Sequence, residues 1–136
     1  MKNDELMIKT VVLARYGGVI DSGSQVDNGK YNHIQIIDFT IEKTILCVID
    51  KENNNAIDIE TGTVWKMINR DENNRIKDTL IPGELYPARI KDCEFSKMGR
   101  LYQLSIKSQA KKAYGLYLEN RIEKEHGKQM IKNKEN

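Results

Sequence analysis

The chain is poor in the residues that build metal sites, disulfide frameworks and nucleophilic active sites. Its 136 residues include two cysteines, Cys47 and Cys93, and two histidines, His33 and His126. The motifs C-x-x-C, H-E-x-x-H, G-x-S-x-G and the P-loop are all missing. We therefore expect no enzymatic activity, no metal and no cofactor. We expect both cysteines to be buried as small apolar side chains. A disulfide between them is the alternative, if the fold brings them together.

Long apolar runs are also missing. No stretch approaches the roughly 18 apolar residues that a membrane helix needs. The N-terminal segment MKNDELMIKTVVLAR has no apolar run of signal-peptide length. These two observations predict a cytoplasmic protein without a membrane partner. At 136 residues the length predicts one domain.

Charge is nearly balanced overall but uneven along the chain. The net charge is +2, which by itself predicts no partner. Residues 1–80 carry ten basic and 13 acidic side chains, whereas residues 81–136 carry 12 basic and seven acidic ones. A polarised surface of this kind would attract a polyanion. The alternative is that side chains of both signs mix on each face once the chain folds.

What the chain does contain is a succession of short β-rich segments. Asp-Asn-Gly at 27–29 and the asparagine-rich run at 52–55 are typical reversals between strands. Glycine-rich residues 16–30 predict a loop or a loose hairpin. The expected strands cover residues 7–15, 31–39, 40–50, 56–60 and 63–68. For the last of these, a short helix that begins at Thr63 is the alternative. Trp65 lies in this segment and is expected to be at least partly buried.

The stretch 81–108 predicts one long β-hairpin. Apolar residues alternate with polar ones on both sides of a reversal at Ser96–Gly99. Basic side chains and two tyrosines lie between the apolar positions, as on many nucleic-acid-binding surfaces. The same pattern also suits an ordinary pair of strands with one face in solvent.

From Gln109 the apolar spacing becomes helical. Ala110, Ala113, Tyr117 and their neighbours predict an amphipathic helix over 109–126. Residues 127–136 have no apolar period and predict a basic, disordered tail. The domain organisation expected is thus a β-barrel over 1–108, the helix and the tail. The fold class is mainly β, a small OB-like or PUA-like barrel of about six strands with one C-terminal α-helix.

Two segments resemble the small single-stranded-DNA-binding proteins of filamentous phages. The segment 82–106 shares with them Pro-Gly, Leu-Tyr, an alternating strand, a short turn with glycine and a second alternating strand. The segment 22–49 shares a polar loop that ends in a glycine before Lys30, Tyr31 and an apolar strand. The resemblance implies an OB-type barrel that binds single strands, with Lys30, Tyr31, Lys97 and Arg100 at the site. It does not extend to the inserted segment 50–80 or to the C-terminal helix.

These observations suggest two alternative functions of different classes. The first is a binding module for single-stranded nucleic acid, encoded by a phage or plasmid. Its expected contact residues are Lys30, Tyr31, Tyr86, Arg89, Lys91, Lys97, Arg100 and Tyr102. The alternative is a protein-interaction module that acts through its barrel or through the helix residues Tyr114, Tyr117 and Leu118, on a partner or in a homodimer.

Overall fold

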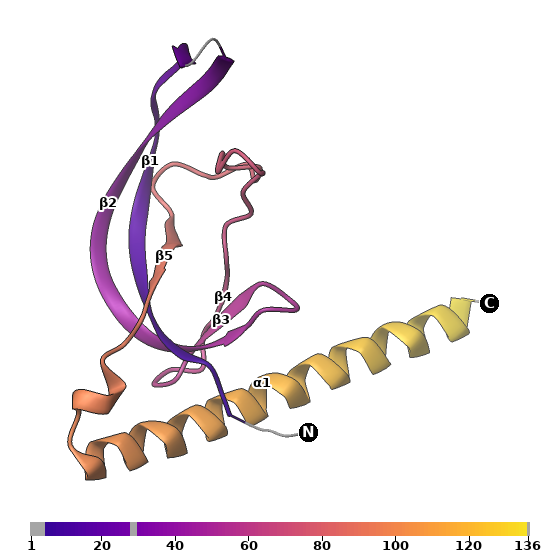
Figure 1. The fold of residues 1–136 in the computed structure, drawn as a ribbon. Helices are drawn as coiled ribbons and strands as arrows, with labels where there is room; N and C mark the ends of the chain where they lie inside the picture. Colours follow the sequence, from indigo (N-terminus) through magenta and orange to yellow (C-terminus); the bar gives the residue numbers. More distant parts are fainter. Residues whose placement is uncertain (1–4, 28–29, 136) are drawn as a thin grey trace. The chain divides into compact units, whose positions relative to one another are not determined.

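A computed structural model describes the backbone of residues 5–27 and 30–135, and the side chains of residues 5–20 and 36–121. Five strands are followed by a short 3₁₀ helix and one long α-helix (Figure 1). The elements are β1 (Ile8–Asp27), β2 (Lys30–Asp50), β3 (Asn55–Asp58), β4 (Val64–Lys66), β5 (Leu85–Lys91), η1 (Phe95–Lys97) and α1 (Arg100–Glu135).

The strands form one antiparallel sheet in the order β4-β3-β2-β1-β5. The prediction of a mainly β fold with a C-terminal helix is therefore confirmed. Within the described residues the sheet is open, with β4 and β5 at its edges, whereas the sequence predicts a closed barrel. The chain divides into two compact units. Unit 1 comprises residues 1–10, 46–65 and 92–136, and unit 2 comprises residues 11–45 and 66–91.

Unit 2 is built on the long strands β1 and β2 together with β5. Val11, Leu13 and Pro87 are among its fully buried side chains. Backbone hydrogen bonds from Tyr16 N to Glu84 O and from Gly83 N to Tyr16 O join β1 to the segment that leads into β5. A Cβ at Gly17 would meet the carboxylate of Asp38, so a larger residue at this strand position requires the Asp38 side chain to shift.

Unit 1 is built around the face of α1 that packs on the sheet. Ile106 and Ala110 are buried together with Val48 of β2 and Ile59. One turn further along α1, Ala113 and Tyr117 are buried against Ile57 of β3. The spacing 106, 110, 113, 117 is the helical period, so a single stripe of α1 supplies both clusters.

The register between β2 and β3 positions this core. Val48 pairs with Ile57, and Asp50 pairs with Asn55 across the antiparallel ladder. The reversal between the strands has Asn54 at φ 57°, a conformation that asparagine tolerates better than most residues. The reversal predicted at 52–55 is thus confirmed. Trp65 on β4 is partly buried, also as predicted.

The predicted hairpin over 81–108 is wrong in its second half. Leu85–Lys91 forms strand β5, but residues from Arg100 onward are helical. The Gln103 N–H donates to Gly99 O at 2.9 Å, which starts the α-helical ladder. Alternating apolar residues over 101–106 also fit a helix that buries only Ile106. Because helix growth from an existing turn adds one hydrogen bond per residue, the helix at 109 extends back to Arg100.

Three further boundaries differ from the prediction. Residues 16–27, expected as a loop or a loose hairpin, continue β1 and thus belong to an arm beside β2, and the two strands expected over 31–50 are one strand, β2. Turn residues 28–29 lie outside the described residues. The backbone of residues 127–135 continues α1, where the sequence predicts a disordered tail. Lysine, glutamine and glutamate in this segment are good helix formers, which favours the continuation.

Candidate functional site

The predicted nucleic-acid-binding residues fall into two groups, one in each unit. Arg89 and Lys91 are exposed on β5 in unit 2. Lys97, Arg100 and Tyr102 are exposed in unit 1, on η1 and the first turn of α1. The residues that the sequence predicts on one hairpin thus belong to two different units. The side chains of Lys30 and Tyr31 lie outside the described residues.

Tyr86 is partly buried and makes its described contacts within unit 2. Its hydroxyl accepts a 2.8 Å hydrogen bond from the backbone N–H of Ile81. Its ring meets the ring of Tyr16 edge-on, with centroids 6.3 Å apart. Tyr16 in turn contacts the ring of Phe39 at 5.6 Å. Tyr86 thus belongs to an aromatic cluster that ties β5 to β1 and β2. Tyr102, by contrast, is 56% exposed.

The predicted interface residues of α1 are mostly used within unit 1. Tyr117 is only 5% exposed and packs against Ile57, so it is not part of an open surface. Tyr114 is partly buried beside it, with ring centroids 5.7 Å apart. Leu118 is 40% exposed and is the one member of this group that faces solvent substantially.

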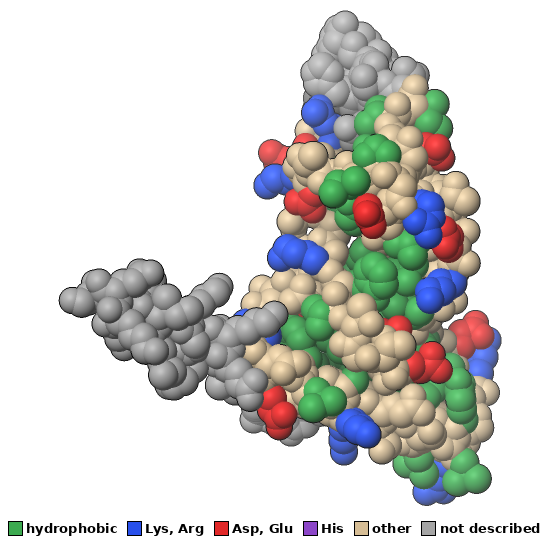
Figure 2. Space-filling view, turned by 180° about the vertical axis from the view of Figure 1, so that it is seen from behind, with side chains coloured by type: hydrophobic (Ala, Val, Ile, Leu, Met, Phe, Trp, Pro, Cys, Tyr) green, Lys and Arg blue, Asp and Glu red, His purple; other side chains and the backbone are tan. Residues whose placement is uncertain are grey.

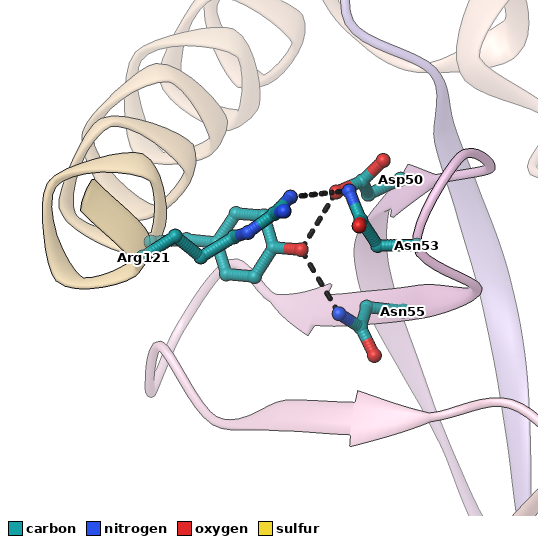
Figure 3. A network of polar contacts seen from close by, with 5 residues as sticks. Asp50, Asn53, Asn55 and Arg121 are labelled. Carbon is teal, nitrogen blue, oxygen red and sulfur yellow. Dashed lines mark hydrogen bonds and ion pairs between the residues drawn. The ribbon is translucent and has the colours of Figure 1, made fainter. Parts of the chain in front are cut away.

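A polar network anchors α1 at this point (Figure 3). The Tyr117 hydroxyl donates to Oδ2 of Asp50 at 2.6 Å and accepts from Nδ2 of Asn55 at 2.9 Å. The same Asp50 oxygen also accepts from Asn53 at 2.8 Å and from Arg121 at 3.3 Å. Burial acts to raise the pKa of Asp50, but these hydrogen bonds and the Arg121 charge outweigh it and lower the pKa. The network thus docks the helix on the end of β2.

Unit 1 contains a pocket of about 490 Å³ on one flank of α1, which we call the basic pocket. This volume is within the range of small-ligand sites. Three separate segments of the chain line it: one leads into the start of β1, one runs from the end of β5 into η1, and one lies on α1. The lining residues are Glu5, Leu6, Ile8, Lys9, Asp92, Cys93, Phe95, Lys107 and Lys111.

The floor of the basic pocket is apolar because it is the rim of the core. Leu6, Ile8 and Phe95 pack against the cluster around Val48 and Ile106. The backbone N–H of Ile49 donates to Met7 O at 2.9 Å, which fixes the N-terminal segment beside β2. The Cys93 thiol donates to Ile8 O at 3.5 Å and ties the opposite wall to that segment.

Three lysine side chains line the basic pocket together with this apolar floor. Lys107 and Lys111 follow the buried Ile106 and Ala110 by one residue each, so they lie on the same flank of α1, one turn apart. The Lys107 ammonium lies 5.8 Å from the centroid of the Phe95 ring, in cation–π range. Among the residues that the structure describes, neither lysine forms an ion pair. Two cations that no carboxylate of the described residues pairs with are thus available to an anion.

The third lysine of the basic pocket, Lys9, forms an ion pair with Asp92. Lys9 Nζ lies 2.6 Å from Oδ1 of Asp92, at the mouth of the pocket. The hydrogen bond and charge of Lys9 lower the pKa of Asp92, so this carboxylate stays ionised at neutral pH. The Asp92 side chain is 89% exposed, and such exposed pairs exchange partners at little cost in free energy.

A second groove, of about 430 Å³, lies on the other flank of α1. It is lined by Ile59, Glu60, Thr61, Gly62, Gln109, Lys112, Ala113 and Leu116. Lys111 and Lys112 therefore line different grooves although they are adjacent in sequence.

On the face drawn in Figure 2, acidic and basic side chains of the described residues are interspersed, so the charges mix there.

Sequence reasoning missed the residues that make the basic pocket. Phe95 lies in a polar turn, and Lys9, Lys107 and Lys111 come from distant segments. The i, i+4 spacing of Lys107 and Lys111 beside apolar Ile106 and Ala110 is the one signal that could have placed both lysines on a common flank of a helix.

The described residues form neither a cluster of metal-ligating side chains nor a helix that could cross a membrane. Within this part of the chain, no group of three histidine, cysteine or carboxylate side chains is placed to hold a metal ion. No helix there is long and apolar enough to cross a membrane. Cys47 is buried and Cys93 partly exposed, and both are free thiols.

Comparison with known proteins gives no relative. The chain matches no protein-family model, no curated protein and no solved structure.

Proposed function

We propose that this protein binds single-stranded nucleic acid and that the basic pocket is its site. The observation that carries the proposal is the combination of a partly exposed Phe95 ring with the ammonium groups of Lys107 and Lys111 in one pocket. Proteins that bind single strands without sequence preference combine aromatic rings for the bases with basic side chains for the phosphates.

Each part of the pocket has a role in this proposal. An unpaired base enters the cavity and lies against Phe95, and Lys107 moves from the ring to a phosphate. Lys111 lies four residues along α1, about 6 Å further on, and contacts a neighbouring phosphate. Lys97 and Arg100, which the sequence already predicted as contacts, lie on the segment that connects Phe95 to this stretch of α1 and extend the basic path. A base inside a duplex cannot enter such a cavity, so the proposed ligand is single-stranded.

The OB-type relationship suggested by the sequence is part of the same proposal. Its support is an antiparallel sheet of five strands followed by one helix. Closure of that sheet into a barrel is not required for the pocket, because all its lining residues belong to unit 1.

Titration of a fluorescein-labelled oligothymidine, followed by anisotropy over a range of salt concentrations, tests the proposal. The double variant Lys107→Gln/Lys111→Gln should bind more weakly. Its slope of log affinity against log salt should be shallower by about 0.7 for each phosphate that the variant no longer neutralises. Lys112→Gln is the matched control, since Lys112 is the next residue of α1 but lines the other groove. Equal weakening in the control and the double variant would show that the pocket is not the site.

A protein-interaction module is the second candidate. It is favoured by apolar side chains that α1 leaves exposed, namely Leu101 at 83%, Leu104 at 53% and Leu116 at 53%. If the wild-type chain binds no oligonucleotide at low salt, this candidate takes precedence. Leu101 and Leu104 would then be the first residues to replace in an interaction assay.

A further inference from the structure

The basic pocket also contains two carboxylates, and they differ in their surroundings. Asp92 is held by Lys9 at 2.6 Å. Glu5, on the N-terminal segment, lines the same pocket, and no ion pair of Glu5 with another described residue occurs. An ionised carboxylate only accepts hydrogen bonds. It therefore favours ligand groups that present N–H donors and disfavours those that present carbonyl oxygens.

The bases differ in the hydrogen-bond donors and acceptors that their Watson–Crick edges present. Guanine presents N1–H and the 2-amino group side by side, so a carboxylate can accept from both. Cytosine and adenine present one amino group beside an acceptor nitrogen. Thymine and uracil present one N–H between two carbonyl oxygens, which repel a carboxylate. Unpaired bases expose this edge to proteins.

We infer that the basic pocket prefers guanine and that Glu5 is the residue that determines this preference. The inference rests on the proposed function, since it concerns the base that enters the same pocket. Phe95 and the lysines treat all bases alike, because every base has a stacking face and every nucleotide a phosphate. Hydrogen bonds from Ile49 to Met7 and from Cys93 to Ile8 hold the segment two and three residues beyond Glu5, and Glu5 itself lines the pocket.

Five oligothymidines of equal length test the inference, one unmodified and four with a single central guanine, inosine, adenine or cytosine. The wild-type chain should bind the guanine strand roughly tenfold more tightly than the unmodified strand, as expected for one two-donor contact. Inosine keeps N1–H but lacks the amino group, and its strand should be intermediate. Glu5→Gln should remove most of this preference and strengthen binding to the unmodified strand, because it removes a negative charge. Glu60→Gln, an exposed carboxylate in the other groove, is the matched control and should change neither.

The outcomes separate this inference from the proposed function. Equal affinity for the guanine and the unmodified strand, with a normal salt dependence, would overturn the guanine preference and leave single-strand binding in place. A preference that persists in Glu5→Gln would overturn the role of Glu5. Free GMP that binds as tightly as the guanine strand would show a mononucleotide site instead of a strand site. Absence of binding to every strand at low salt would overturn both proposals.

Discussion

The Tyr117 hydroxyl donates a 2.6 Å hydrogen bond to Oδ2 of Asp50, from a residue 67 positions away in the chain. Both residues are buried, at 5% and 7% exposure. This bond joins α1 to the end of β2, on the same helix that carries Lys107 and Lys111 into the basic pocket. The position of the pocket therefore depends on how α1 is docked on the sheet.

Removal of that hydroxyl should loosen the docking. We expect Tyr117→Phe to lower the free energy of unfolding by about 1.5–3 kcal/mol, the usual contribution of a hydrogen bond to a charged group. Tyr102→Phe, on an exposed residue of the same helix, should have almost no effect. Urea denaturation followed by circular dichroism measures both. Equal stability of the two variants would show that the Tyr117–Asp50 bond contributes nothing.

The lowered pKa of Asp50 predicts a loss of stability in acid. Its folded-state pKa lies below the unfolded value of about 3.9. The unfolded chain therefore binds more protons, and the stability contributed by Asp50 is present above about pH 4 and lost as the pH falls through the folded pKa. Asp50→Asn should be less stable at neutral pH and less sensitive to acidification, as measured by melting temperature. An unchanged pH profile in Asp50→Asn would contradict this account.

Two glycines should respond in opposite directions to alanine. Gly115 is exposed on α1 with open space around its Cα, so Gly115→Ala should raise the free energy of unfolding by about 1 kcal/mol. Gly17→Ala should lower it by about 1 kcal/mol or more, because the new methyl group overlaps Asp38. Thermal melts of both variants provide the test. Destabilisation by Gly115→Ala would mean that the α1 backbone around residue 115 is not a regular helix.

The sequence predicts the strands better than their connections. Reversal residues and β-rich runs located β3, β4 and β5, whereas β2 was predicted as two strands because the sequence alone does not show that its pairing is unbroken. The segment Leu101–Lys107 was misassigned because its alternation also satisfies a helix that buries Ile106 alone. Which pattern forms is decided by packing on Val48 and Ile59, which are far away in the sequence.

The candidate site was less predictable than the fold. Basic residues such as Lys97 and Arg100 could be identified from the sequence, but not the cavity beside them. The basic pocket is assembled from residues 5–9, 92–95 and 107–111, so only the folded chain brings its members together. Tyr86 and Tyr117 were predicted as contact residues because tyrosine suits binding surfaces. Their hydroxyls instead satisfy internal hydrogen bonds.

The two thiols should differ strongly in reactivity. Burial, with a smaller contribution from the Asp58 charge, raises the pKa of Cys47 to about 12, so it carries almost no thiolate under mildly alkaline conditions. Cys93 lines the basic pocket and is partly exposed. We expect one thiol per native chain to react with Ellman's reagent and the second only after unfolding. Cys93→Ser should abolish the fast reaction.

Protection of Cys93 by a bound strand tests the central claim most directly. The rate at which N-ethylmaleimide modifies Cys93 is measured as a single-stranded oligonucleotide is added, with a duplex of the same length as control. If single strands occupy the basic pocket, the rate should fall as the strand saturates the protein, with a midpoint equal to the dissociation constant from anisotropy. The duplex should protect far less. An unchanged rate at saturation with the single strand would show that nucleic acid does not occupy the pocket.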